Sequence, residues 1–340
     1  MKQEVTLGID IGGTTTQFGL VDRAGNVFFD ATIDTASFET ADEYLAYLYQ
    51  KIEEKTATLK SELIEIKAVG IGAPNGNYYK GIIDCAPNLK WGKNRVDFVE
   101  KFNRYFNVPM ALTNDANAAA LGEMIFGYGK DGYEIDGQLV PIRDFIMITL
   151  GTGLGSGIIV DGRMVYGHDG FAGEMGHMTA VEHGRRCGCS RNGCLEAYAS
   201  APGLKRTVFE LIAENPYRNS ALKMYNYERL EAKNIYEEAL KGDEIALEAF
   251  RKTGELLGKK LADAAAVTTP KAFFLFGGLA KSGDLILEPT RKAFYENLLD
   301  VYKKGNIVID ISKLFKEGKN IAVMGAAALA WDEYEKSQQA

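Results

Sequence analysis

Hydrophobic and polar positions along the chain alternate in a way that predicts strands and helices in turn, which is typical of an α/β protein. Short apolar runs next to glycine or proline predict strands over residues 66–74, 109–115, 271–278 and 306–312. Helical spacing of apolar residues covers 40–60, 96–106, 116–127 and 320–336. Thr40 is the expected N-cap of the first helix. Residues 196–268 are predicted to be mostly helical, with a break near Asn215-Pro216.

One pattern occurs twice. Residues 7–27 (LGIDIGGTTTQFGLVDRAGNV) and 147–165 (MITLGTGLGSGIIVDGRMV) both read as a strand, a glycine-rich turn and a second strand that ends in Val-Asp. Gly12 aligns with Gly151, and Asp22 aligns with Asp161 at the same offset. Either the chain consists of two related halves, or two common hairpins agree by chance; the match on both sides of each turn favours related halves.

The two turns are candidate phosphate-binding sites. Glycine allows backbone conformations that aim successive N–H groups at one anion, and threonine adds hydroxyl donors. A strand follows each turn, so neither is a P-loop, which needs a following helix and a lysine. Together the turns are expected to hold the β- and γ-phosphates of ATP, through Gly12, Gly13, Thr14, Thr15, Gly151, Thr152 and Gly153.

Two aspartates are candidates for the chemistry. Asp10 precedes the first turn and either holds Mg²⁺ or caps the turn. Asn114-Asp115 falls where a predicted strand gives way to a helix, which is where ligands bind in open α/β sheets. Asp115 is therefore either a helix N-cap or a general base that accepts the proton of a hexose hydroxyl. Asn114 would orient a second hydroxyl.

A third candidate site has the composition of a zinc centre. His177, Cys187, Cys189 and Cys194 have the spacing H-x9-C-x-C-x4-C, and tetrahedral zinc accepts one His and three Cys. The alternative is a set of free thiols with an unrelated histidine. Glu174 and Glu196 bracket the cluster, and an ordered loop would carry both carboxylates to one side of it.

Bulk composition narrows the class of protein. The chain has 340 residues, a net charge of -7 and a pI near 5.3. Such an acidic protein is not expected to bind nucleic acid or an anionic membrane. There is no apolar window of membrane-spanning length and no secretory pattern at the N-terminus, so a cytoplasmic location is expected.

The motifs together resemble the ROK family of bacterial sugar kinases and sugar-responsive repressors, within the actin/hexokinase/Hsp70 superfamily. IDIGGTTTQFGLVD and LGTGLGSGII resemble its two phosphate motifs, and TNDANAAALGE resembles its catalytic-aspartate motif. GIGAP and APNLKW resemble segments that border the sugar pocket. GEMGH with CGCSRNGCLE resembles the family signature and zinc loop, and FGGLAKSGD resembles the adenosine motif.

The resemblance implies a fold and a set of roles. Two related actin-like domains with a cleft between them would comprise residues 1–112 plus about 326–340, and residues 113–325 with the zinc loop at 177–194. Asp115 would be the catalytic base that makes glucose 6-phosphate from glucose and ATP. Asn88, Asn114, Glu174, His177 and Glu196 would bind the sugar, and Gly277 and Gly278 would lie beneath the adenosine. Zinc would be structural, and the protein would form a homodimer or a higher homo-oligomer.

Three positions depart from the family pattern: Thr15 replaces a common lysine, Asn75 replaces the last glycine of GxPG, and Ser190 replaces a glycine after the second cysteine. Two alternative functions remain open. One is a kinase for N-acetylmannosamine, N-acetylglucosamine, fructose or allose. The other is a sugar-sensing repressor. Repressor relatives carry a helix-turn-helix before the first phosphate motif, whereas here that motif begins close to Met1, so this function is disfavoured.

Overall fold

The computed structural model describes residues 2–59 and 64–339, which pack as two compact units. One unit contains the chain up to Arg143, Gly157–Ala172 and the segment from Lys313 onward. The other contains Asp144–Ser156 and Gly173–Ser312. The domain boundary expected at 112/113 stays a prediction, because packing and duplicated topology need not divide a chain at the same place. No helix among the described residues is both long and apolar enough to cross a membrane.

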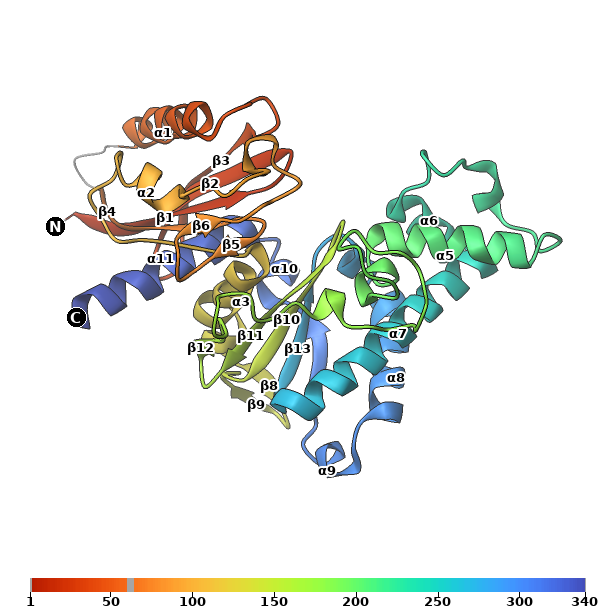
Figure 1. Cartoon of the computed structure of the whole chain (residues 1–340). Helices are drawn as coiled ribbons and strands as arrows, with labels where there is room; N and C mark the ends of the chain where they lie inside the picture. Colours follow the sequence, from red (N-terminus) through yellow and green to blue (C-terminus); the bar gives the residue numbers. More distant parts are fainter. Residues whose placement is uncertain (1, 60–63, 340) are drawn as a thin grey trace. The chain divides into compact units, whose positions relative to one another are not determined.

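The first unit is built on a five-stranded sheet with the order β3-β2-β1-β4-β7 (Figure 1). Its strands are β1 (Gln3–Ile11), β2 (Thr15–Asp22), β3 (Val27–Asp34), β4 (Ile64–Gly72) and β7 (Met110–Thr113). β1 to β3 form antiparallel pairs, whereas β4 pairs in parallel with both β1 and β7. The carboxyl ends of β1, β4 and β7 therefore lie along one edge of the sheet.

Helices cover this sheet. α11 (Ile321–Gln339) packs on β1 and β4 and against α3 (Asp115–Phe126). α1 (Ala41–Thr58) buries Tyr44, Leu45, Leu48 and Ile52 in the core of the unit. The shorter elements of the unit are β5 (Gly76–Asn77), β6 (Ile82–Ile83), η2 (Lys90–Gly92), α2 (Phe98–Phe102), α4 (Tyr128–Asp131), β8 (Tyr133–Ile135), β9 (Gln138–Val140) and α10 (Lys313–Lys316).

A second five-stranded sheet has the order β12-β11-β10-β13-β14. Its strands are β10 (Phe145–Leu150), β11 (Leu154–Val160), β12 (Arg163–Met164), β13 (Ala272–Phe276) and β14 (Val308–Ile311). β10 and β11 flank the second glycine-rich turn just as β1 and β2 flank the first. The predicted pair of strand–turn–strand units is therefore confirmed.

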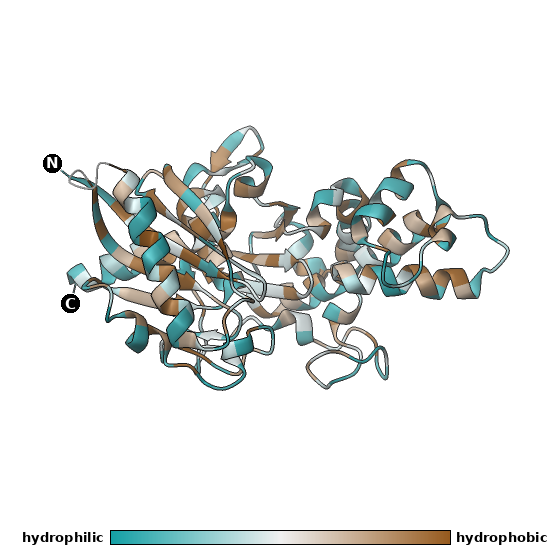
Figure 2. Cartoon of the chain, turned by 90° about the horizontal axis from the view of Figure 1, so that it is seen from above, coloured by the Kyte–Doolittle hydropathy of each residue, from teal (hydrophilic) through white to brown (hydrophobic). Residues whose placement is uncertain are grey.

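The second unit is rich in helices. α7 (Glu244–Thr268) is its longest helix among the described residues and packs against α5 (Ala201–Glu214) and α8 (Asp284–Asn297). The remaining helical elements are η3 (Met175–His177), η4 (Leu195–Ala197), η5 (Ala221–Met224), α6 (Ala232–Leu240), η6 (Leu279–Ser282) and α9 (Asp300–Lys303). Figure 2 shows that strands are mostly hydrophobic, whereas helices alternate between hydrophobic and hydrophilic residues, as one-sided packing requires.

Most predicted elements are present. The Thr40 hydroxyl accepts a hydrogen bond from the Glu43 N–H, so Thr40 is the N-cap of α1. The break after α5 falls at Asn215, as predicted. The end predicted for α1 at Lys60 lies outside the described residues. The helix predicted over 96–106 is too long, since α2 ends at Phe102.

Candidate functional site

Asp10 and Asp115 lie at the carboxyl edge of the first sheet, on either side of Gly72. Gly72 ends β4 and pairs with Asp10 of β1 and with Thr113 of β7. A Cβ at Gly72 would come within 3.0 Å of Asp10 Oδ1 and 3.6 Å of Asp115 Cα. A side chain at Gly72 would therefore crowd the Asp10 carboxylate and the start of α3, which carries Asp115.

The surroundings of both carboxylates disfavour their charged forms. Burial raises the pKa of Asp10 to about 7, and the neighbouring charge of Asp115 adds to this effect. Burial also raises the pKa of Asp115, while hydrogen bonds from the N–H groups of Ala116 and Asp115 itself oppose the rise. Asp115 is nevertheless an exposed residue, so a small molecule can reach its side chain.

Asn114, rather than Asp115, occupies the N-cap of α3. Its Oδ1 accepts a hydrogen bond from the Ala116 N–H at 2.9 Å, and its backbone is extended. Asp115 is the first residue of the helix, and its Oδ1 also accepts from the Ala116 N–H, at 2.8 Å. The N-cap of this helix is therefore Asn114, and Asp115 is not needed as a cap.

The first glycine-rich turn lies against the segment that carries Asn88. The Gly12 N–H donates to the Thr15 carbonyl at 2.9 Å and closes the turn, while the side chains of Thr14 and Thr15 are exposed. A Cβ at Gly13 would meet the Asn88 carbonyl oxygen at 2.7 Å, so only glycine permits this approach. The structure therefore brings together a predicted phosphate turn and a predicted sugar-binding residue.

A buried polar network lies next to this turn and supports it. The Thr16 hydroxyl is 2.7 Å from the Thr35 hydroxyl and 2.8 Å from the Tyr44 hydroxyl. Tyr44 is fully buried, and its ring stacks on Trp91, which belongs to the APNLKW segment. Sequence reasoning missed this network, because Thr16, Thr35 and Tyr44 look like ordinary strand and helix residues.

The second glycine-rich turn is tied to the segment that follows the zinc loop. The Gly151 N–H donates to the Gly153 carbonyl at 3.0 Å. The Leu154 N–H donates to Oε2 of Glu196 at 3.0 Å. Thr152 and Glu196 also line one small cavity of about 90 Å³. Glu196 thus lies beside the turn, although 42 positions separate it from Leu154.

The four predicted zinc ligands are close together. The ligand atoms of His177, Cys187, Cys189 and Cys194 all lie within 4.8 Å of one another. The Cys189 and Cys194 sulfurs are 3.6 Å apart, and the Cys187 sulfur is 3.7 Å from His177 Nδ1. Tetrahedral zinc with Zn–S bonds of about 2.3 Å places its ligand atoms roughly 3.5–3.8 Å apart. The cluster therefore fits a structural zinc ion with no open coordination position.

His177 connects this cluster to Glu174. Its Nδ1 faces Cys187, while its Nε2 lies 3.8 Å from Oε2 of Glu174. On the other side, the Cys187 sulfur lies 3.6 Å from Oε1 of Glu196. Both predicted glutamates thus flank the metal-ligand cluster, which agrees with the idea that ordering the loop also orders them.

Two of the three departures from the family pattern have a clear conformation. Asn75 and Ser190 have positive φ angles of 52° and 72°, a region that favours glycine. Asn75 compensates, since its Nδ2 donates to the carbonyls of Asp84 and Cys85, both at 3.1 Å. Thr15, the third departure, has an exposed side chain.

The second glycine after β13 borders a cavity of about 690 Å³ in the second unit. Gly278 lines it, and a Cβ there would meet no heavy atom within 4 Å. Gly277 instead packs on β10, because a Cβ there would be 2.5 Å from the Leu150 carbonyl oxygen. Tyr236 and Phe250 from α6 and α7 add apolar walls. Sequence reasoning missed both, since aromatic residues on a helix usually indicate core packing.

The structure thus brings Asp10 and Asp115 together in the first unit, and Glu174, Glu196 and the four predicted metal ligands together in the second. The ROK family model matches residues 6–333. A glucokinase of Streptomyces coelicolor is 34% identical, covering 96% of this chain and 97% of the relative. A xylose repressor of Caldicellulosiruptor bescii is 29% identical, covering 91% of this chain and 74% of the repressor.

A solved structure of a ROK family glucokinase from Streptomyces griseus, in complex with glucose and AMPPNP, has a TM-score of 0.75 and 34% identity. The match covers 96% of this chain and 99% of that structure. The expected two-domain actin-like fold is therefore confirmed. Taken with the family model, these matches establish that the chain belongs to the ROK family.

Proposed function

We propose that the protein is an ATP-dependent sugar kinase that phosphorylates glucose to glucose 6-phosphate. The observation that carries this proposal is the Asp10–Asp115 pair at the carboxyl edge of the first sheet, with accessible surface on Asp115. Similarity to glucokinases over almost the whole chain supports the reaction type and the choice of sugar.

Asp115 is assigned as the general base. It accepts the proton of the sugar hydroxyl while the hydroxyl oxygen bonds to the γ-phosphorus of ATP and ADP leaves. The raised pKa of Asp115, which comes from the protein atoms around it, makes its carboxylate a better proton acceptor. Asn114 keeps α3 capped, so the start of the helix stays in place while Asp115 reacts.

Asp10 is assigned to the Mg²⁺ that accompanies ATP. Its carboxylate is destabilised by burial and by Asp115, and a bound divalent cation would offset both effects. The N–H groups and hydroxyls of the two glycine-rich turns are assigned to the phosphates. The cavity beside Gly278 has the volume usual for a small-ligand pocket and is assigned to adenosine.

The sugar is assigned to Asn88, Asn114, Glu174, His177 and Glu196. Carboxylates and amides of this kind accept and donate hydrogen bonds to hydroxyl groups. A zinc ion held by His177 and the three cysteines would be structural, since four protein ligands leave no position for a reacting water. We also propose a cytoplasmic location, where ATP is available, and assembly as a homodimer, which rests on the family resemblance alone.

ADP release, coupled to a spectrophotometric reaction, tests the function. Glucose, N-acetylmannosamine, N-acetylglucosamine, fructose and allose are compared with Mg²⁺ and ATP present. We expect kcat/KM to be highest for glucose, and the kcat of the Asp115→Asn variant to be about 10²–10⁴-fold lower with every sugar. A higher value for another sugar would overturn the choice of glucose, and no sugar-dependent ADP release would overturn the kinase assignment.

A further inference from the structure

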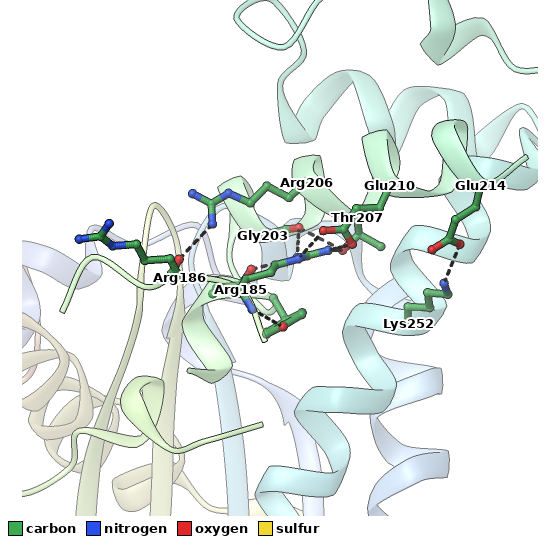
Figure 3. A network of polar contacts seen from close by, with 10 residues as sticks. Arg185, Arg186, Gly203, Arg206, Thr207, Glu210, Glu214 and Lys252 are labelled. Carbon is green, nitrogen blue, oxygen red and sulfur yellow. Dashed lines mark hydrogen bonds and ion pairs between the residues drawn. The ribbon is translucent and has the colours of Figure 1, made fainter. Parts of the chain in front are cut away.

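Arg185 lies in the zinc loop, two residues before Cys187, and has every N–H of its guanidinium hydrogen-bonded. Nε and Nη2 donate to the two carboxylate oxygens of Glu210. Nη2 also donates to the Thr207 hydroxyl, and Nη1 donates to the carbonyls of Ala197 and Gly203. An arginine has five such donors, so none is left for a ligand. Figure 3 shows the side chain extending to α5, which carries Gly203, Thr207 and Glu210.

This side chain is also held by packing. Its guanidinium lies 4.4 Å from the centre of the Tyr198 ring, and its exposed fraction is only 10%. Tyr198 in turn accepts a hydrogen bond at its hydroxyl from the Arg185 N–H, at 2.8 Å. A paired, stacked and largely desolvated guanidinium contributes more to stability than an exposed ion pair does.

The contacts of Arg185 join the residues just before Cys187 to those on both sides of Cys194. The Arg185 carbonyl accepts from the Gly193 N–H at 2.8 Å, next to Cys194. The carbonyl that Nη1 binds belongs to Ala197, the residue after Glu196. Glu196 then accepts from the Leu154 N–H of the second glycine-rich turn. A continuous set of contacts thus runs from α5 through Arg185 to Glu196 and that turn.

We propose that Arg185 is a positioning residue. Its contacts hold Glu196 and the metal ligands in place independently of the metal. Zinc would be held by His177 and the cysteines, whereas Arg185 holds the loop against α5. Lysine at this position keeps the charge but has no planar fork, so it cannot reproduce the paired and backbone contacts together. The part that concerns the sugar rests on the proposed function, whereas the part that concerns the loop does not.

The neighbouring arginines differ from Arg185 in their exposure. Arg186 and Arg206 are exposed, and the Arg206 Nη1 donates to the Arg186 carbonyl at 3.2 Å (Figure 3). Arg218, outside the loop, forms an exposed ion pair with Glu244 at 3.3 Å. Arg218→Lys is therefore a matched control, because it makes the same chemical change at an arginine without the buried contacts.

The test compares Arg185→Lys, Glu210→Gln, Thr207→Val and Arg218→Lys in the zinc-loaded protein. Release of zinc to a coloured chelator needs no sugar, and neither does hydrogen exchange at the Leu154 amide. We expect Arg185→Lys to weaken zinc binding about 10–100-fold, as loss of a supporting contact does in other metal sites. Exchange at Leu154 should become faster, while Arg218→Lys should match the unmodified protein in both measurements.

Steady-state kinetics provide the functional arm. Arg185→Lys should raise KM for glucose about tenfold, the size of effect expected for one charge-assisted network, and should leave KM for ATP nearly unchanged. Glu210→Gln and Thr207→Val keep the arginine and should give smaller changes in the same direction. Zinc release and Leu154 exchange that match the unmodified protein would overturn the proposal. A changed loop in Arg185→Lys, together with no turnover of any hexose by the unmodified protein, would instead overturn the proposed function alone.

Discussion

Asp10 and Asp115 are placed on opposite sides of Gly72, and the charge of Asp115 adds to burial in disfavouring the ionised form of Asp10. The pKa of Asp10 in the folded protein, about 7, is above the ordinary value of 3.8. The charged form is therefore less favourable in the folded state than in the unfolded state. The free energy of unfolding should fall as pH rises from about 4 to about 7 and stay lower above that range.

The first prediction is that Asp10→Asn stabilises the nucleotide-free protein, by a larger amount at pH 8 than at pH 5. Asparagine removes a charge that the folded protein tolerates poorly at high pH. Differential scanning calorimetry at the two pH values measures the difference in Tm. The same variant should lose most of its turnover, because the proposed Mg²⁺ ligand is gone.

Asp284→Asn is a suitable control for this measurement, since Asp284 is an exposed residue in the first turn of α8. Its effect on Tm should be the same at both pH values. If Asp10→Asn also gave equal changes at pH 5 and pH 8, the electrostatic description of the pair would be wrong.

The second prediction concerns Asp115→Asn. The amide keeps an oxygen that accepts from the Ala116 N–H, so α3 should start as before. Loss of the proton acceptor should lower kcat by about 10²–10⁴-fold. Rapid-quench or coupled kinetics measure kcat, and circular dichroism checks the fold. Near-normal turnover in a folded variant would remove Asp115 from the role of base.

Local patterns predicted the parts of the fold that depend on neighbours in sequence. Glycine between apolar runs marked both turns, and Thr40 was recognised as a cap because capping is a local interaction. The predicted helix over 96–106 was too long because of distant contacts. The centres of the Tyr105 ring and the Tyr49 ring of α1 are 4.7 Å apart, and the chain leaves the helix after Phe102. Tertiary packing outweighs helical spacing at this position.

In the candidate site, too, the features that depend on sequence neighbours were predicted, and those that depend on distant contacts were not. Motif residues such as His177 and Cys187 were found because ligand spacing is visible in the chain. The partners of Arg185 and Thr16 could not be found in this way. Each depends on residues from other elements, whose approach is decided by packing of helices and strands.

The third prediction concerns zinc. Cys189→Ser or Cys194→Ser should release the metal, lower Tm and raise KM for the sugar far more than KM for ATP. The physical reason is that Glu196 follows Cys194 by two residues and lies 3.6 Å from the Cys187 sulfur. His177→Ala should have a larger effect, since His177 also lies next to Glu174. Elemental analysis measures the zinc content.

Cys85→Ser serves as the control for these variants, because Cys85 is exposed in the first unit and belongs to no ligand group that the described residues form. It should keep zinc, Tm and both KM values. An unchanged sugar KM in the zinc-free cysteine variants would show that the metal does not order the sugar-binding residues.

The last prediction compares the two residues that stand in place of a family glycine. Ser190 holds a φ of 72° within the zinc loop, and its side chain is exposed. Ser190→Gly should relieve the strain of this conformation, which for a residue other than glycine costs about 1 kcal/mol. Zinc release to a chelator should become slower, and Tm should rise slightly.

Asn75→Gly makes the same replacement at a φ of 52°, but it should destabilise the protein. Asparagine tolerates this region better than serine, and its side chain donates to the Asp84 and Cys85 carbonyls. Losing two such hydrogen bonds should cost about 1–2 kcal/mol, more than glycine regains. Urea denaturation of both variants measures the two free energies of unfolding. Opposite signs are expected, and the same sign in both would mean that backbone strain and side-chain hydrogen bonds are balanced differently from this account.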